Sequence, residues 1–125
     1  MLSITSVSTK QPIPNLVLSN SLRMTVIGMI KTLAGELGPE GIRFNSILPG
    51  WTETERVHDL LESRARRNNT TIEVEYAVQA EQAALRRLAT PREFATVAAF
   101  LCSPAASYLT GLMLSVDGGS YKGTF

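Results

Sequence analysis

The stretch Gly41–Thr54 reads Gly-Ile-Arg-Phe-Asn-Ser-Ile-Leu-Pro-Gly-Trp-Thr-Glu-Thr, and it decides the fold. The largely apolar run Ile42–Leu48 predicts a buried strand, which the Pro49-Gly50 pair ends in a turn. Thr54 is a hydroxyl residue suited to capping a helix that opens at the next position. In open α/β sheets, ligands bind at the carboxyl ends of the strands. The stretch therefore predicts a binding edge that presents backbone groups and a Thr hydroxyl.

Strands and helices alternate along the rest of the chain. Strands are predicted at Met1–Ser6 and Leu112–Val116. Apolar residues spaced three and four apart predict four helices: from Ser19 or Asn20 to Leu37, from Glu55 to Ser63, from Thr71 to Leu85, and from Thr90 to Leu101. Arg64–Thr70 is predicted to be a loop. Thr90-Pro91-Arg92-Glu93 has the pattern of a capping box at the start of the last helix. Strands separated by helices favour parallel pairing through right-handed crossovers. The predicted fold class is α/β, with about three strands and four helices.

Length and charge narrow the possible functions. The chain has 125 residues, so it is one domain or part of one. Its formal net charge is +1, and so small a charge gives no electrostatic field that would indicate nucleic acid or an anionic membrane as partner. Cys102 is the single cysteine, which fits a reducing cytoplasm, and its place on an apolar helical face predicts a packed structural thiol. Arg64, Arg66 and Arg67 are interpreted as a solvated helix end. Neither a signal peptide nor a membrane-spanning run is expected.

Several motifs together resemble the short-chain dehydrogenase/reductases, and in particular members similar to 3-oxoacyl-carrier-protein reductase. They are Ser6, Ser19–Arg23, Asn45, Pro49-Gly50 with Thr54, Thr90-Pro91-Arg92-Glu93, Tyr108-Leu-Thr-Gly111 and Val116-Asp-Gly-Gly119, in the order and spacing of that family. The resemblance implies that residues 1–125 are the C-terminal half of a doubly wound, parallel-sheet domain of the Rossmann type. The glycine-rich half that binds phosphate would precede Met1.

The resemblance also implies a chemistry and a set of site residues. Such enzymes transfer a hydride between NAD or NADP and a carbonyl or alcohol, using a Ser, a Tyr and a Lys. Ser6 would hold the substrate oxygen, and the Tyr and Lys positions fall on Ser19 and Arg23. Arg23 would contact the cofactor, and Pro49, Gly50 and Thr54 would border the nicotinamide. The expected site contains no metal.

Ser19 departs from the family pattern in a way that matters for proton transfer. A phenol has a reference pKa of about 10, and a close cation lowers it, whereas an aliphatic hydroxyl is a far weaker acid. Arg23 supplies a fixed charge but does not lose its proton. Proton transfer is therefore expected to be impaired or altered. His58 and Tyr76, in a segment that resembles the family's mobile lid, are the alternative acid/base groups.

Three hypotheses for function remain open. The first is an NAD(P)-dependent oxidoreductase, active in a complete protein. The second is a non-catalytic relative that binds a nucleotide, a ligand or another subunit, and the third is a folding fragment without activity of its own. A homo-oligomer or a complementing N-terminal half is expected to cover the long helix and the strand edge at Met1–Ser6. Trp51 is expected to line a pocket, and Tyr108 to lie in the core or an interface.

Overall fold

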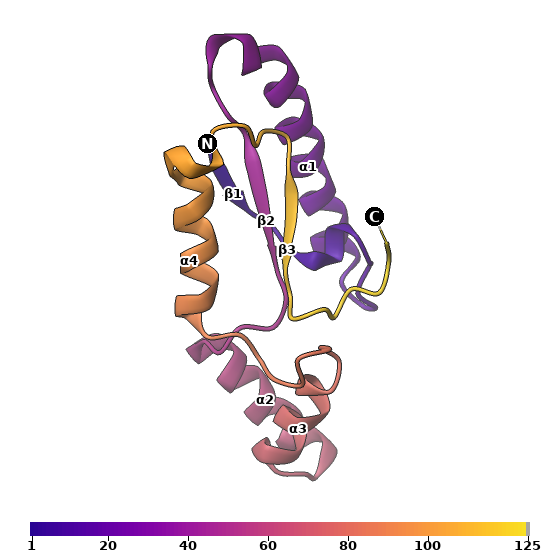
Figure 1. The fold of residues 1–125 in the computed structure, drawn as a ribbon. Coiled ribbons are helices and arrows are strands. Elements are labelled where there is room, and N and C mark those ends of the chain that lie inside the picture. The colour runs from indigo at the N-terminus through magenta and orange to yellow at the C-terminus, as the bar shows by residue number, and fades with distance from the viewer. Residues whose placement is uncertain (125) are drawn as a thin grey trace.

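A computed structural model describes residues 1–124 and shows a parallel sheet with helices on both faces (Figure 1). The strands are β1 (Leu2–Ile4), β2 (Asn45–Pro49) and β3 (Met113–Val116); the helices are α1 (Val17–Leu37), α2 (Glu55–Asn68), α3 (Ile72–Ala80) and α4 (Pro91–Cys102); short 3-10 turns cover Val7–Thr9, Gly38–Glu40 and Pro104–Ala106. The predicted fold class, three strands and four helices of a partial doubly wound α/β domain, is confirmed.

The strand order is β1-β2-β3, so β2 is central and all pairs are parallel. Ile47 of β2 pairs with Ile4 on one side and with Leu114 on the other. Within the described residues β1 pairs only with β2, which leaves its outer edge open as expected. All three strands therefore end at one edge, beside α2 and α3 (Figure 1).

Two clusters of apolar side chains hold the helices on the sheet. On one face, Ile30 and Ala34 of α1 pack with Phe44. On the other face, Leu101 of α4 packs with Ile47 and with Ala106. Residues of β3 divide between the two clusters because alternate side chains of a strand point to opposite faces. This arrangement leaves the carboxyl ends of the strands uncovered by either helix.

Helix α1 begins earlier than expected. It starts at Val17 rather than at Ser19 or Asn20, and neither of these caps it. The Asn20 side chain instead binds the loop before the helix, donating to the Ile13 carbonyl at 2.9 Å. The Ser19 hydroxyl accepts a hydrogen bond from Arg23. Ser19 is therefore used in a bond within α1 and Asn20 in a bond to the preceding loop, and the prediction of a cap at these positions is wrong.

Helix α2 is longer than expected. It runs to Asn68, through most of the segment predicted as a loop, and ends where Asn69 adopts a left-handed conformation with φ 54°. Ala65 is buried, and Arg66 and Arg67 in the last turn complement the negative end of the helix dipole. The polar sequence after Ser63 is thus a helical surface.

Helix α3 is shorter than expected and ends at Ala80 rather than Leu85. The chain then turns back to the sheet, and the Leu85 N–H donates to the Gly118 carbonyl at 3.1 Å. Ala83 is buried within this turn. Tertiary contact with the end of β3 therefore overrides the helical pattern.

One prediction about side-chain burial is wrong, and one is narrowed to a single alternative. Cys102 is exposed rather than packed, since it lies at the end of α4 beyond the buried Leu101. Tyr108 is fully exposed, which excludes a place in the core and leaves the predicted interface as the alternative. Among residues 1–124, none of the helices combines the length and the apolar character needed to cross a membrane.

Candidate functional site

Arg23 connects the start of α1 to the end of β1. Its Nε donates to the Ser19 hydroxyl at 3.0 Å, one helical turn earlier. Its Nη1 donates to the Thr5 carbonyl at 2.6 Å, directly after β1 and directly before Ser6. The structure thus brings Ser19 and Arg23 together and joins them to the backbone beside Ser6. Arg23 is half-buried, so its charge acts where solvent screens it less than at the open surface.

Ser6 lies at the sheet edge where the first strand gives way to a turn. Its hydroxyl oxygen accepts the Ser8 N–H at 3.1 Å and caps the turn Val7–Thr9. Its carbonyl accepts the Thr9 hydroxyl at 2.8 Å. A hydroxyl that accepts one bond still has its own proton to donate. Ser6 therefore combines a structural bond with a donor that remains available to a ligand.

The Pro-Gly turn forms one wall of a cavity of about 330 Å³ beyond β2. Its lining includes all three residues predicted to border a nicotinamide, Pro49, Gly50 and Thr54. A Cβ on Gly50 would lie 2.7 Å from the Cα of Asp117, so only glycine fits at this close approach. Thr54 caps α2, as predicted, and accepts the Val57 N–H at 3.4 Å.

Thr52, on the same cavity wall, carries a buried hydroxyl oxygen without a hydrogen-bond partner among residues 1–124. Buried polar groups of this kind are rare and call for an explanation, such as a ligand or a water. The wall therefore combines backbone groups, two Thr side chains and the apolar Val57 and Phe94. This set of groups fits a flat, partly polar ring such as a nicotinamide.

A second cavity of about 740 Å³ runs between α2 and α3, with Thr54 at one end. Its floor includes Leu61 and Ile72, and both alternative acid/base groups lie along it. The Tyr76 hydroxyl donates to Glu53 at 2.5 Å, and this bond raises the pKa of Tyr76, with burial as a smaller cause. Tyr76 is thus held in its protonated form, which makes it a weaker proton donor than an ordinary tyrosine.

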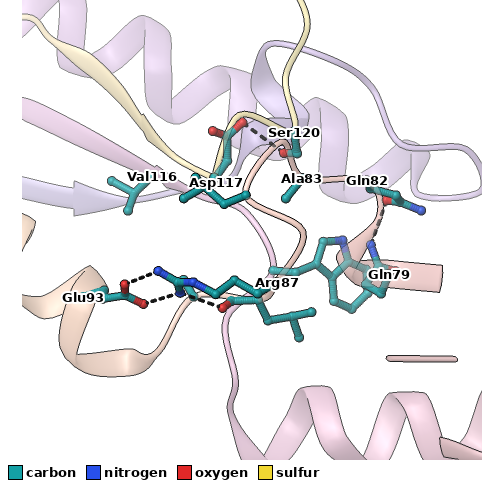
Figure 2. A pocket seen from close by; sticks show the side chains of 13 residues that line it. Gln79, Gln82, Ala83, Arg87, Glu93, Val116, Asp117 and Ser120 are labelled. Atoms are coloured by element: carbon teal, nitrogen blue, oxygen red, sulfur yellow. Dashed lines mark hydrogen bonds and ion pairs between the residues drawn. The ribbon is translucent and has the colours of Figure 1, made fainter. Parts of the chain in front are cut away.

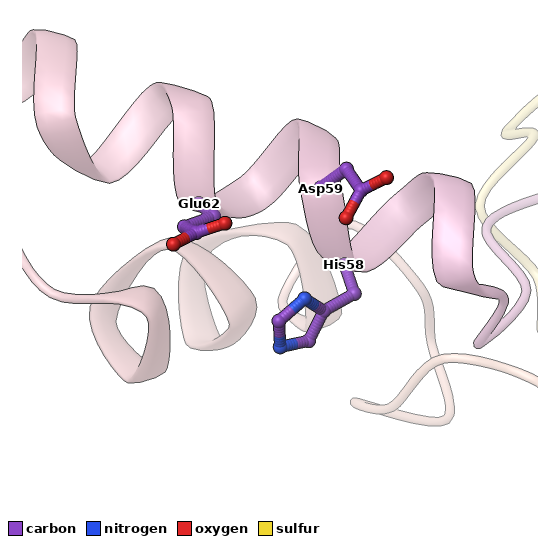
Figure 3. A group of neighbouring side chains, drawn as sticks. All are labelled: His58, Asp59 and Glu62. Atoms are coloured by element: carbon purple, nitrogen blue, oxygen red, sulfur yellow. The ribbon is translucent and has the colours of Figure 1, made fainter.

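His58 lies on the exposed side of α2, beside Asp59 and Glu62 (Figure 3). The possible ligand atoms of the three side chains lie within 4.8 Å of one another. Glu62 accepts a hydrogen bond from Arg66 at 2.7 Å, and this bond lowers its pKa. The group therefore has the features of a surface ion-pair cluster on one helix.

A smaller cavity of about 120 Å³ lies where the α3–α4 connection meets the end of β3 (Figure 2). Arg87 forms a two-pronged ion pair with Glu93, at 2.6 and 2.8 Å. Glu93 also accepts the Thr90 N–H and completes the predicted capping box. The Arg87 bond, followed by the Thr90 bond, lowers the pKa of Glu93 from 4.5 to about 2.

A further cavity, of about 300 Å³, lies between the segment after Ser6 and the helices α2 and α3. Trp51 lines both this cavity and the one in Figure 2, but it is not among the residues that line the cavity at the Pro-Gly turn. The guanidinium of Arg64 stacks over the Trp51 ring at 5.1 Å from the centroid and donates to Gln79 at 2.9 Å.

Arg64 is the residue of this region that sequence reasoning missed. The sequence pattern predicts one solvated cluster of Arg64, Arg66 and Arg67, but only Arg66 and Arg67 are exposed. On a helix, however, Arg64 falls three residues after the buried Leu61 and shares its face. Helical spacing was the available signal, and the expectation of a loop over these residues concealed it.

Comparison with known proteins supports the expected resemblance. The family model described as enoyl-(acyl carrier protein) reductase matches residues 1–121. Among curated proteins, the chain is 37% identical over 120 residues to dehydrogenase/reductase SDR family member 4 of Sus scrofa, covering 96% of this chain and 40% of the relative.

Two solved structures share the fold closely. L-sorbose reductase from Gluconobacter frateurii, complexed with NADPH and L-sorbose, has a TM-score of 0.91 and 30% identity, covering 98% of this chain and 47% of that one. An NADPH-bound short chain oxidoreductase from Pseudomonas aeruginosa, described as containing an atypical catalytic center, has a TM-score of 0.83 and 30% identity, covering 98% and 46%. The chain spans less than half the length of these relatives.

Proposed function

Since the chain belongs to the short-chain dehydrogenase/reductase family, we propose that it forms the substrate-binding and proton-handling half of an NAD(P)-dependent oxidoreductase that interconverts a carbonyl and an alcohol. The observation that carries this proposal is the pair of Arg23 hydrogen bonds, to Ser19 and to the Thr5 carbonyl beside Ser6. These bonds support the proposal because they bring Ser19 and Arg23 to the backbone beside Ser6, at the carboxyl end of β1, and ligands bind at that edge of open α/β sheets.

The proposed roles follow from the donors and acceptors at each position. Ser6 donates its remaining proton to the substrate oxygen and orients it. Pro49, Gly50 and Thr54 border the nicotinamide in the cavity beyond β2, with Thr52 as a further polar group on that wall. NAD or NADP supplies or accepts the hydride when bound. Arg23 offers donors and a permanent charge to the cofactor or to the developing oxyanion.

Ser19 and Arg23 alter the proton transfer rather than reproduce it. An arginine stays protonated, and a serine hydroxyl ionises far less readily than a phenol. The pair therefore stabilises negative charge by hydrogen bonding while delivering a proton inefficiently. The NADPH-bound Pseudomonas oxidoreductase with an atypical catalytic center supports the view that this fold accommodates such departures.

The proposal is tested by cofactor binding and turnover in two polypeptides. Residues 1–125 alone are expected to show no micromolar binding of NADPH by fluorescence titration, because phosphate recognition in this fold relies on a glycine-rich turn. A longer polypeptide that places such a glycine-rich half ahead of residues 1–125 is expected to bind NADPH and to oxidise it with a ketone or an aldehyde. Absence of cofactor binding by the longer polypeptide contradicts the proposal.

A second candidate is a non-catalytic relative that acts through subunit contacts, and α1 favours it. Of its 21 residues only Ile30 and Ala34 are buried, while Leu18 and Leu22 are 75% and 65% exposed. An apolar face of this kind marks an interaction surface. We infer that a second copy of the chain, or a complementing N-terminal half, covers it in the working protein, which we place in the cytoplasm.

A further inference from the structure

We propose that the substrate carries a carboxylate in addition to the reacting carbonyl or alcohol, and that Arg64 binds this carboxylate in the cavity after Ser6. The inference deepens the proposed oxidoreductase function and rests on it, because Ser6 identifies where the reacting oxygen would lie. The binding of the carboxylate itself needs no cofactor and is tested separately.

The cavity has the position and size of a substrate pocket. It measures about 300 Å³ and is lined by Val7, which directly follows Ser6, and by Trp51, which directly follows the Pro-Gly turn. Arg64 of α2 and Gln79 of α3 also line this cavity, so the two helices of the proposed lid form part of its wall. A molecule in this space therefore touches the substrate-holding segment and the lid at the same time. Ligand pockets in proteins begin at about this volume.

Arg64 is held in place by protein contacts that leave donors free. Its guanidinium stacks on the Trp51 ring, and its Nη1 donates to Gln79 Oε1. Gln79 is buried, with 3% of its surface exposed, and its own amide donates to Gln82 at 2.7 Å (Figure 2). A guanidinium has five N–H donors, and within residues 1–124 this one has a single hydrogen bond. The unused donors suit a carboxylate, which guanidinium binds in two-pronged fashion.

No acidic side chain neutralises Arg64 within the part of the chain that the structure describes. The cavity lining contains no Asp or Glu, and Arg64 forms no ion pair within 4.0 Å. The charge of Arg64 acts only weakly on Glu75. The pKa of Glu75 is lowered mainly by hydrogen bonds from Thr70 and Asn68, and the charge of Arg64 is a smaller cause. Lys10 lies over the Tyr121 ring, 5.5 Å from its centroid, but it is not among the lining residues, so within residues 1–124 Arg64 is the only cation that lines the cavity.

The lining favours a singly charged organic anion over phosphate. A single guanidinium faces the space together with the rings of Trp51 and Tyr121, the apolar Val7 and Ile13, and carboxamides. Phosphate sites usually add backbone N–H groups at a helix start or several cations. An oxo acid or hydroxy acid with a short apolar body matches this mixture better.

The test uses the fluorescence of Trp51, the only tryptophan of the chain. The 125-residue chain is titrated with 2-oxo, 4-oxo and 5-oxo carboxylic acids of short aliphatic chain, with the matching neutral ketones, and with inorganic phosphate. We expect at least one acid to give a saturable change and to bind about tenfold or more tighter than its neutral ketone, since a charge-assisted pair is worth about 1.5–3 kcal/mol.

The variants separate recognition by Arg64 from a general charge effect. Arg64→Gln is expected to lose the preference for the acid, Arg64→Lys to keep part of it, and Arg67→Gln, on the exposed side of the same helix, to behave as the unmodified chain. Calorimetric titration repeats the measurement for Arg64→Gln, because that change also alters the surroundings of Trp51. Circular dichroism checks that each variant keeps its helices.

Several outcomes overturn the inference. They are equal binding of acid and ketone, a stronger response to phosphate than to any acid, no saturable response to any acid, or an unchanged acid preference in Arg64→Gln. A failed NADPH test in the longer polypeptide, with carboxylate binding intact here, would instead refute the proposed redox function and leave the anion site standing.

Discussion

At the scale of single residues, the hydrogen bond from Arg23 to Ser19 is the feature most open to experiment. The Arg23 Nε and the Ser19 hydroxyl are 3.0 Å apart on successive turns of α1. This spacing places a phenol at position 19 and an ammonium at position 23 within reach of each other. Such a pair would lower the pKa of the phenol and allow it to transfer a proton near neutral pH.

We therefore predict that Ser19→Tyr combined with Arg23→Lys raises carbonyl reduction in a polypeptide that binds NADPH. General acid–base catalysis contributes about 10²–10⁴-fold, so an increase of at least about tenfold in kcat is expected. Initial rates of NADPH oxidation measure it. Ser21→Tyr, an exposed position on the same helix, is the matched control and leaves the rate unchanged. An activity that stays level in the double variant would indicate another acid/base group, with His58→Ala as the next variant.

At the scale of secondary-structure elements, the start of α4 illustrates a local signal that works. The Thr90-Pro91-Arg92-Glu93 sequence predicts a capping box, and the structure has both of its reciprocal hydrogen bonds. These contacts lie within one turn, so the sequence specifies them without tertiary information. The ion pair to Arg87 adds a contact that the motif does not predict.

The capping box leads to a prediction about acid stability. The pKa of Glu93 falls from 4.5 to about 2, so its stabilising contribution is present above about pH 4.5 and is lost as the pH falls toward 2. Glu93→Gln keeps an amide oxygen for the cap but loses the charge. The Tm difference between the parent chain and this variant is expected to be largest near neutral pH and to close in that acid range. Glu81→Gln, whose ion pair at 4.0 Å is more exposed, is the control and should show little difference at any pH.

The boundaries of α2 and α3 show where sequence reasoning fails. The loop expected from Arg64 is helical because Ala65 is buried, and α3 stops short because Leu85 bonds to Gly118 at the end of β3. The Leu85–Gly118 bond joins segments far apart in the chain, and the burial of Ala65 is set by packing that its polar sequence neighbours do not reveal. Periodicity within a window contains neither. The same limit hid Arg64, whose place beside Trp51 depends on α2 continuing. The Pro49-Gly50 turn and the Thr54 cap were predictable because their geometry is local.

At the scale of the whole molecule, the exposed face of α1 predicts association. Leu18 and Leu22 are apolar, neighbouring on the helix and largely exposed, whereas the buried face of α1 is already used against the sheet. Covering this face with a second copy would remove apolar surface from water. Sedimentation of the 125-residue chain is therefore expected to show a dimer or a larger assembly.

Variants test whether α1 forms that contact. Leu18→Glu combined with Leu22→Glu is expected to shift the assembly toward monomer by at least about tenfold in its dissociation constant, because charges on an apolar interface lose solvation. Val78→Glu, an exposed apolar position on α3, is the matched control and should leave the assembly intact. Circular dichroism separates dissociation from unfolding. A parent chain that sediments as a monomer, or a double variant that stays associated, contradicts the prediction.

The hydrogen bonds of the Asn45 side chain bear on which parts of this chain can change in sequence and length. Its side chain donates to the Leu109 carbonyl at 2.8 Å and accepts the Leu112 N–H at 3.0 Å, across 64 and 67 positions of sequence. The sheet is thereby fastened at its amino end, while the whole of α2 and α3 is an excursion from its opposite end. The entropy of closing such an excursion grows only slowly with its length. Length changes in the connection between α2 and α3, from Asn69 to Thr71, should thus be tolerated by the scaffold, whereas the turn at Ala83 and Leu85 is fixed to the sheet. Such changes would let the surface of this excursion vary without refolding the framework.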